Sequence, residues 1–515
     1  MMAGGNITKI SSGSMQEIAK QEHISFAKTI ESSAANKVNE RSTDGVVFGE
    51  PEKSVVKEDL VDVVVGIFFD GTGNNRKNID SRIAVNSTYT EKLGWKWKWQ
   101  DNTSYENDRT NVDHLEKMYK KETLYYSIYT EGIGTTNDEY DSVVEMGTGM
   151  GSTGIRGKVR DCCEELVKTI KSATNKNINQ LTVDVFGFSR GAAAARNFVH
   201  EITKPAYKAL PGPHGILMDD DGRAVSQPDL PARGHFGLKM QKKLKINFVK
   251  IRFAGLYDTV SAYGLKHSDD VTQLNLNAIN KASKIVHLTA ADEHREKFEL
   301  TSVTTGTELS LPGVHSDIGG SYRDNITESV SLAEELFTVN NWREKVLAEK
   351  ARLIEQGWYR DNQMTNDQPY KLIGNRLLSN KYSLIPLHLM FEMGKETCKF
   401  LETQINSGLY KIPDKAIGRN KVVLSDLYTR LKAYAILKTK PAMLFNNAGQ
   451  LRSIKNMVDR GLYPNEKYQE TVKDAEILYD LRNRYLHFSS SWDGVGKEPA
   501  INERGERERV VFNPR

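Results

Sequence analysis

The feature that most constrains the fold is the run from Leu181 to Ile202, which changes character halfway along its length. Its first part, LTVDVFGF, is apolar and rich in β-branched and aromatic residues, which is typical of a strand buried on both faces. Its second part, GAAAARNFVHEI, has helical spacing, and its small residues let a helix lie close against a sheet. Between the two stands Gly187-Phe188-Ser189-Arg190-Gly191, so a serine occupies a tight turn from strand to helix.

Three further apolar stretches read as strands: VDVVVGIFF from Val61, LYYSIYT from Leu124 and KINFVKIRFAGLYD from Lys245. A helical stretch, VRDCCEELVKTIKSA, precedes the strand that leads to Ser189. Strands that alternate with helices in this way indicate an α/β fold, with a mainly parallel central sheet flanked by helices.

The chain divides by composition into four expected parts. Residues 1–58 form a polar leader, either mobile or able to dock on a partner, and 59–328 form the main α/β body with loop insertions at 76–110, 204–240 and 264–284. Residues 329–480 are expected to be a mainly helical cap or second domain, with 331–358 as its longest helix candidate, and 481–515 are expected to return to the body, with a strand in LRNRYLHFSSSW.

Composition excludes several classes of protein. Lys and Arg number 71 against 67 Asp and Glu, a net charge of +4, which argues against a nucleic-acid binder that works by bulk charge. Three cysteines exclude a disulfide framework. Because we find no secretory signal and no membrane-spanning stretch, we expect synthesis in the cytoplasm without a signal peptide, with another component carrying the chain outside the cell.

The turn at Ser189 predicts nucleophilic chemistry. A G-x-S-x-G sequence between a strand and a helix is the nucleophile elbow of an α/β-hydrolase, in which a histidine activates the serine and a carboxylate orients the histidine. Asp258 directly follows a later strand, which is the place of the acid in this fold. Two histidines compete for the role of base: His315 in LPGVHSDIGGSY, and His487 in RYLHFSSS as the runner-up.

An oxyanion intermediate needs two backbone N–H groups, one from the residue after the serine and one from a loop after an earlier strand. Arg190 supplies the first, and the glycine-rich loop at Gly71 and Thr72 is the expected source of the second. The same loop, FFDGT, has Phe68 where a D-x-D-G-T phosphatase carries its nucleophilic Asp, which argues against a phosphatase of this type. We predict no metal site and no cofactor, since no Cys/His cluster has zinc spacing.

The insertion after this loop contains Trp95-Lys96-Trp97-Lys98-Trp99. In a strand, Trp95, Trp97 and Trp99 would share one face, which could lie at a lipid surface with the lysines near anionic headgroups. The alternative is a hairpin that packs its tryptophans on the body.

Four motifs occur in order: FFDGTGNN from Phe68, GFSRGA from Gly187, GLYDTV from Gly255 and PGVHSDIGGSY from Pro312. Together they resemble the family 1 lipase effectors of the bacterial type VI secretion system. That resemblance implies a Ser189–Asp258–His315 triad, which favours His315 over His487. It also implies a phospholipase A that acts as an antibacterial toxin on membrane phospholipid, makes peripheral membrane contact, and is secreted into the periplasm of the target cell. The partners it implies are a secretion spike or tube component and a cognate immunity protein.

Two other functions stay open on the sequence. The chain could be a serine esterase that acts on a small soluble ester. It could also be a catalytically idle hydrolase fold that serves as a binding module. Lipid and soluble-ester assays separate the first possibility from a phospholipase, and labelling of Ser189 by a fluorophosphonate separates the second.

Overall fold

The central element is a six-stranded sheet in the order β11-β9-β8-β3-β1-β2, in which every neighbouring pair is parallel. The structure is a computed structural model, and it describes residues 60–84, 103–240, 244–264, 270–334, 341–368, 370–418, 420–443, 448–494 and 496–512. The strands are β1 (Val61–Phe69), β2 (Tyr125–Thr130), β3 (Ile178–Phe188), β8 (Ile246–Tyr257), β9 (Lys284–Ala290) and β11 (Thr307–Leu311). The predicted parallel α/β architecture is confirmed.

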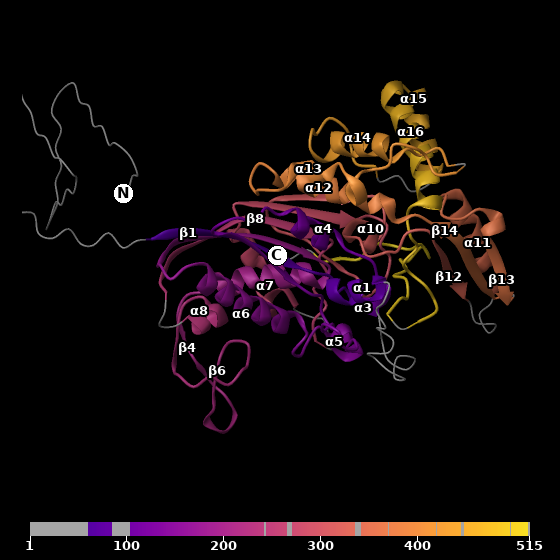
Figure 1. The fold of residues 1–515 in the computed structure, drawn as a ribbon. Helices are drawn as coiled ribbons and strands as arrows, with labels where there is room; N and C mark the ends of the chain where they lie inside the picture. Colours follow the sequence, from indigo (N-terminus) through magenta and orange to yellow (C-terminus); the bar gives the residue numbers. More distant parts are fainter. Residues whose placement is uncertain are drawn as a thin grey trace, which may run out of the picture. The chain divides into compact units, whose positions relative to one another are not determined.

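Helices cover both faces of this sheet (Figure 1). One face packs on α6 (Ile155–Ala173), α7 (Arg190–Thr203) and α8 (Gly234–Met240), and the other on α4 (Asn111–Met118), α10 (His315–Gly319) and α12 (Leu384–Gly394). Side chains of β1 alternate between the two layers: Val65 and Ile67 belong to the first, Phe68 to the second. This explains why the strand is apolar along its whole length, since neither face meets water.

The region after the main sheet, which the sequence predicts to be mainly helical, contains several helices but begins with strands. It opens with a three-stranded antiparallel sheet in the order β12-β14-β13, built from β12 (Ile326–Glu334), β14 (Lys371–Leu378) and β13 (Met364–Gln368). The start of the expected long helix, Ser331–Glu334, lies in β12, and α11 spans only Trp342–Glu355. Short apolar runs fit a strand as well as a helix, and pairing with β14 decides for the strand.

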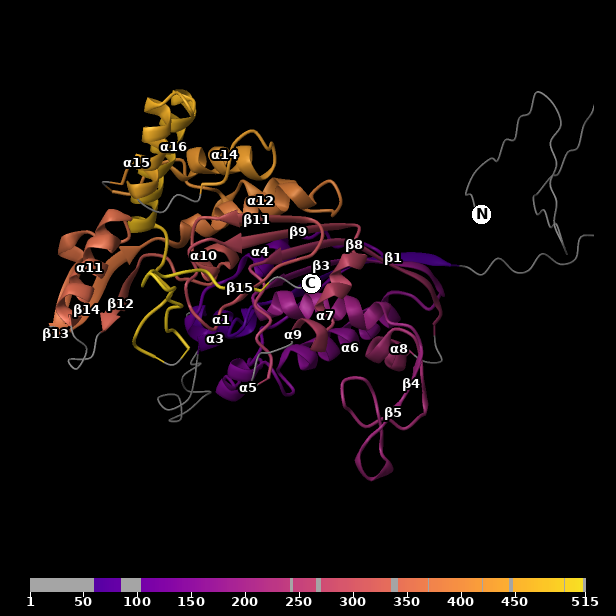
Figure 2. The ribbon, with the colours of Figure 1, turned by 180° about the vertical axis from the view of Figure 1, so that it is seen from behind.

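The helices of this region stand beyond α12 on the same side of the main sheet (Figure 2). They are α13 (Glu402–Ile405), α14 (Leu424–Ala435), α15 (Ala448–Asp459) and α16 (Asn465–Arg484). Residues 59–515 form one compact unit, so the helices and the sheet share a common core. No helix in the described ranges is long and apolar enough to cross a membrane.

The C-terminal segment meets the body in a different way from the expected strand. LRNRYLHFSSSW continues α16 to Arg484 and then runs without regular structure. The returning strand is β15 (Val511–Phe512), which pairs with β10 (Leu300–Thr301). The strand that pairs with β10 is therefore formed by the last described residues, which the sequence analysis did not single out.

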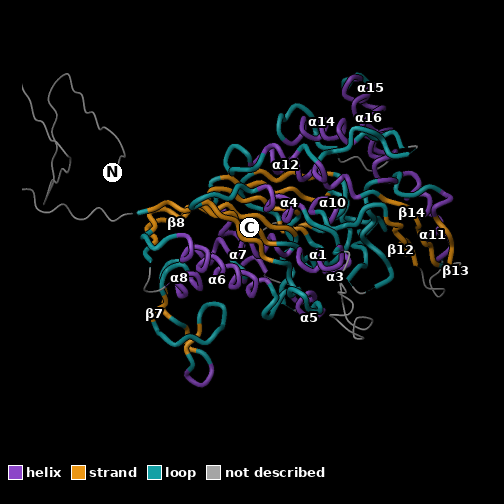
Figure 3. Tube along the Cα trace, in the orientation of Figure 1, coloured by secondary structure: helices purple, strands orange, loops and turns teal. Residues whose placement is uncertain are grey.

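The remaining elements are short. The insertion at 204–240 projects from the body as loop-rich hairpins (Figure 3), with β4 (Tyr207–Lys208) paired to β7 (Asp229–Leu230) and β5 (Leu210–Pro211) to β6 (Leu217–Met218). The other short helices are α1 (Arg76–Ile83), α3 (Thr103–Glu106), α5 (Val143–Thr148), α9 (Asp270–Gln273) and the 3-10 turns η2 (Pro213–Gly215), η3 (Leu276–Lys281), η4 (Asp361–Gln363), η5 (Asn380–Ser383) and η6 (Gly408–Tyr410).

Candidate active site

Ser189 stands on a strained turn between β3 and α7. Its backbone has φ 58° and ψ −130°, a combination that a non-glycine residue adopts only where the surrounding structure enforces it. A Cβ on Gly187 would collide with the carbonyl oxygen of Gly191, and a Cβ on Gly191 with that of Asp70. The two glycines of the predicted motif are therefore required by the close crossing of strand, turn and helix.

His315 and Asp258 meet beside this turn. His315 Nδ1 lies 2.6 Å from Asp258 Oδ2, and both residues are buried. Asp258 follows β8, the strand whose Tyr257 carbonyl accepts a hydrogen bond from the Ser189 amide at 3.0 Å. The His315 ring lies against Phe188, the residue before the serine, with ring centroids 4.6 Å apart. The structure thus pairs His315 with Asp258 and places this pair beside the turn of Ser189, although no hydrogen bond joins His315 Nε2 to Ser189 in the described residues.

The unused nitrogen of His315 is available for proton transfer. Its Nε2 atom is buried and has no hydrogen-bond partner among the described residues. Burial lowers the pKa of His315 below its usual value, against the hydrogen bond and charge of Asp258, which raise it. A neutral imidazole held by a carboxylate on one nitrogen is the state in which a histidine can accept a proton from a serine.

Asp258 is surrounded by donors. Its Oδ1 accepts the Ala290 amide at 2.8 Å, and Nη2 of Arg509 lies 3.1 Å from each of its oxygens. Burial would raise the pKa of Asp258, but Arg509, His315 and the Ala290 amide outweigh it and hold the pKa below its usual value. The carboxylate therefore stays ionised through the neutral range.

The predicted oxyanion donors need one correction. The Gly71 amide donates to Asp70 Oδ1 at 2.7 Å, so it is not free to bind a substrate oxygen. The Thr72 and Arg190 amides have no such partner in the described ranges. Arg190 Nε donates to Thr72 Oγ1 at 2.9 Å, which ties the loop to the start of α7. The residues that remain as donors are Arg190 and Thr72.

Asp70 holds this loop in place. It is buried, and besides Gly71 it accepts hydrogen bonds from Thr110 Oγ1 at 2.7 Å and Tyr129 Oη at 2.5 Å. Burial raises its pKa to about 6. The Asp of the FFDGT stretch is thus a structural anchor, consistent with the sequence-based argument against a phosphatase of this type.

Replacing Asp70 by alanine should lower kcat for a short soluble ester by about 10²-fold, close to the loss of one oxyanion donor. Three donors would lose their shared acceptor, and the Gly71-Thr72 turn would no longer be fixed. The Asp70→Asn variant keeps one carbonyl oxygen for Gly71 and Thr110, and we expect a much smaller loss. Kinetics and thermal unfolding of both variants provide the test, and an alanine variant that keeps the parent's kcat would refute the anchoring role.

His487, the runner-up base, is engaged elsewhere. Its Nδ1 lies 2.7 Å from Asp317 Oδ1, its amide donates to Asp317 Oδ2 at 3.0 Å, and its ring stacks on Tyr322 with centroids 3.6 Å apart. Asp317 follows His315 by two residues in α10. His487 therefore supports the helix that carries His315.

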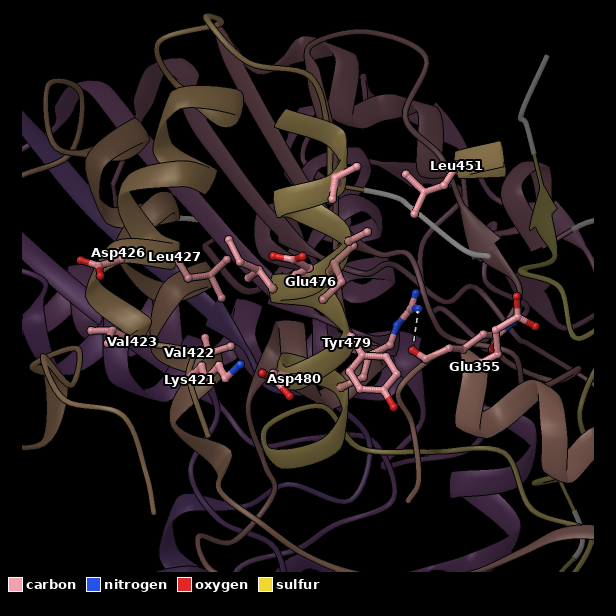
Figure 4. Close-up of a pocket in the computed structure, with 16 residues that line it drawn as sticks. Glu355, Lys421, Val422, Val423, Asp426, Leu427, Leu451, Glu476, Tyr479 and Asp480 are labelled. Carbon is pink, nitrogen blue, oxygen red and sulfur yellow. Dashed lines mark hydrogen bonds between the residues drawn. The ribbon is translucent and has the colours of Figure 1, made fainter. Parts of the chain in front are cut away.

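One cavity lies away from this site, and another lies next to Asp258. One of about 830 Å³ is bounded by α11, α14, α15 and α16, with Asp426, Glu476 and Asp480 among the charged residues that Figure 4 shows around it. It does not include any residue of the proposed triad. A second of about 380 Å³ is lined by Ala290 and Arg509, which both donate to Asp258, and by Arg482. We assign neither cavity to the scissile ester.

Some of the predicted residues lie outside the described part of the chain, and two residues of the site were not predicted. Trp95, Trp97 and Trp99, like the leader 1–58, lie outside the described residues. Two charged residues of the site were not singled out: Arg509, and the buried Glu293, whose Oε2 accepts the His315 amide at 3.2 Å. Glu293 follows the apolar stretch KIVHLTA, which is β9, so recognising that strand would have pointed to it.

The comparisons with known proteins identify the family and a similar fold. The sequence matches the family described as the type VI secretion system phospholipase effector, Tle1-like, catalytic domain, over residues 65–339. No curated protein matches the chain. Among solved structures, the Tle1 effector bound to the VgrG spike from the type 6 secretion system is similar, with a TM-score of 0.50 and 20% identity over 88% of this chain and 94% of that one.

A second similar structure is an uncharacterized protein from Pseudomonas aeruginosa, with a TM-score of 0.32 and 16% identity over 83% of this chain and 65% of that one. The family match spans 275 of the 515 residues and contains all four sequence motifs. The chain therefore belongs to the Tle1-like phospholipase effectors of the type VI secretion system.

Proposed function

We propose that this effector cleaves a carboxylic ester bond of membrane phospholipids, as a phospholipase A, through Ser189, His315 and Asp258. The observation that carries the proposal is the buried His315–Asp258 pair, 2.6 Å apart, beside a serine on a strained turn. A serine hydroxyl is a weak nucleophile without such a base. The arrangement supplies the base and its orienting carboxylate at one place.

In the proposed reaction Ser189 Oγ attacks the acyl carbonyl while His315 Nε2 takes its proton. The Arg190 and Thr72 amides bind the oxyanion, and Asp258 stabilises the imidazolium. His315 then protonates the departing alcohol of the lysophospholipid, which leaves an acyl-serine. Water, deprotonated by His315, attacks that ester, releases the fatty acid and restores Ser189.

An apolar rim beside the oxyanion loop supports a lipid substrate. Helix α5 exposes Val143 and Val144, which are 60% and 73% accessible. The helix lies next to the site, where Arg190 Nη1 donates to the Gly147 carbonyl at 3.4 Å. Exposed apolar side chains that gather next to a reaction centre are typical of a surface that meets another apolar surface.

The double substitution Val143→Ser, Val144→Ser should lower hydrolysis of phospholipid vesicles by about tenfold, since two exposed valines would no longer enter the lipid. Cleavage of a short soluble ester should be unchanged. Leu462→Ser is the matched control, because Leu462 is 72% accessible but lies in the turn between α15 and α16. An equal loss in both assays, or an equal loss in the control, would refute a lipid contact at α5. Contact through Trp95, Trp97 and Trp99 stays a separate hypothesis.

Delivery follows from the family and from the solved relative, which is bound to a VgrG spike. We propose that a secretion spike or tube component carries this chain into the periplasm of a target cell, and that the producing cell makes a cognate immunity protein. The leader 1–58 and the region 329–480 are the two proposed contact surfaces for the carrier.

The decisive experiment is mass spectrometry of phospholipid vesicles after incubation with the protein. Lipids that carry different acyl chains at the two positions identify which ester is cut. Release of one fatty acid and the matching lysophospholipid, absent with Ser189→Ala, is the expected result. Cleavage of short soluble esters with intact vesicle lipids would support a soluble esterase instead. A Ser189 that fluorophosphonates do not label, with no ester cleaved, would support an idle fold.

A further inference from the structure

The last described segment of the chain reaches the back of Asp258. Strand β15 pairs with β10, and the Leu300 amide donates to the Val510 carbonyl at 2.9 Å. Strand β10 is in turn joined to the residue after Asp258, because the Thr301 amide donates to the Thr259 carbonyl at 2.9 Å. Arg509 therefore enters the site from a backbone that is held by β10 at the next residue, Val510.

The guanidinium of Arg509 forms a close pair with this carboxylate. Its Nη2 atom lies 3.1 Å from both oxygens of Asp258, whose side chain is fully buried, and the Arg509 side chain is only 11% accessible. Its Nε and Nη1 atoms are buried and have no hydrogen-bond partner in the described part of the chain. A buried cation with unmatched N–H groups is costly, so the pair with Asp258 is the interaction that keeps Arg509 in this place.

We propose that Arg509 is a positioning residue of the catalytic site, which fixes the orientation of the Asp258 carboxylate and sets the basicity of His315 through it. The proposal rests on the proposed triad. Asp258 contacts Arg509 on one side and His315 on the other. When the imidazole is protonated, the single negative charge of Asp258 interacts with two cations, which also repel each other. The imidazolium is therefore less stabilised than it would be by Asp258 alone, and His315 stays a free base at lower pH.

Other charges around His315 come from several elements. Glu293 and Arg295, from the loop after β9, lie close and act in opposite directions on its pKa, and Asp317 on its own helix is paired with His487. Glu293 is itself held by Arg295, so this pair is nearly neutral as a unit. Arg509 is the cation that touches the partner of His315 directly.

This arrangement determines the direction in which the pKa of His315 should change when Arg509 is replaced. Removing the Arg509 charge leaves His315 as the only charged group in direct contact with Asp258 among the described residues, with Arg295 still acting at longer range, so the imidazolium gains stability and the pKa of His315 rises. The base is then protonated over a wider range, and the acid limb of kcat/KM against pH moves to higher pH. We expect a shift of about one unit for Arg509→Met and for Arg509→Gln, which keeps an amide donor for folding. Arg509→Lys keeps the charge, and we expect it to restore most of the parent profile.

The test uses the full-length protein with two readouts. The first is the pH profile of kcat/KM on a short soluble ester. The second is the titration of His315 by NMR with labelled histidine rings, assigned with His315→Gln, which does not depend on activity. Arg507→Met is the matched control: it removes a buried arginine of the same segment that contacts Ser490, Glu349 and the Leu332 carbonyl and not Asp258, and we expect neither readout to change while β15 stays paired with β10.

The proposal is supported if the acid limb of kcat/KM and the titration of His315 both move to higher pH in Arg509→Met and Arg509→Gln, and return toward the parent values in Arg509→Lys. An unchanged His315 titration in folded Met or Gln variants, or an equal shift in the Arg507 control, overturns it. Failure of the proposed function has a different signature, because Ser189→Ala would then hydrolyse the ester like the parent, whereas the histidine titration still reports on Arg509. If the Met variant does not fold, the Gln variant decides.

Discussion

Replacing His315 by alanine should lower kcat for ester hydrolysis by several orders of magnitude. The Ser189 hydroxyl would lose its only proposed proton acceptor and stay protonated at neutral pH. Activity above the uncatalysed rate should survive, since the Arg190 and Thr72 amides would still bind the oxyanion. Steady-state kinetics on a short soluble ester and the rate of fluorophosphonate labelling of Ser189 both measure this loss.

His487→Ala is the matched control for this variant. It removes a buried histidine that is also paired with an aspartate, but one that holds α10 and does not contact Asp258. We expect less than about a tenfold change in kcat for a residue that acts only as support. Fast labelling of Ser189 in His315→Ala, together with its loss in His487→Ala, would place the base on the C-terminal segment and refute the assignment.

The second large effect is expected for Asp258→Asn, at about 10⁴-fold in kcat. The amide nitrogen of asparagine can replace Oδ2 at His315 Nδ1, which then has to accept a hydrogen bond, so the proton moves to Nε2 and the imidazole can no longer act as base. The same variant leaves Arg509 facing a neutral side chain, which we expect to lower thermal stability. The fold should persist, since asparagine has the shape of aspartate.

The combination of Asp258→Asn with His315→Ala tests whether the two residues work as one unit. The losses should not add, because an orienting group has no function once the base is gone. A double variant whose loss equals the product of the two single losses would mean that Asp258 acts independently of His315. Circular dichroism of all three variants separates a chemical effect from unfolding.

The elbow could be predicted from sequence because its determinants are local. The apolar strand, the two glycines and the helix around Ser189 follow one another in the chain, and steric crowding leaves no other arrangement. The donors around Asp258 could not be found in the same way. Arg509 is one of several arginines in a polar segment, and only the pairing of β15 with β10 selects it.

The same contrast explains the errors in the fold. Strand β12 has short apolar stretches that suit a helix equally well, and its partner β14 lies far along the chain. At Gly71 the sequence predicted an oxyanion loop, and this loop does contact Arg190 through Thr72, yet the neighbouring carboxylate of Asp70 accepts the Gly71 amide. Which of the two adjacent amides, that of Gly71 or that of Thr72, is free depends on hydrogen-bond geometry, which a glycine pattern does not encode.

The pair of Asp258 and Arg509 joins residues 251 positions apart, and this has a consequence for synthesis. A ribosome that has completed Ser189, Asp258 and His315 has still to add nearly two hundred residues before Arg509 emerges. Until then Asp258 lacks the cation that we propose to fix it, and β15, which follows this cation, has not joined β10. The proposed hydrolytic centre is therefore complete in the nascent chain only after residue 509 has been added, long after the six strands of the main sheet have been made.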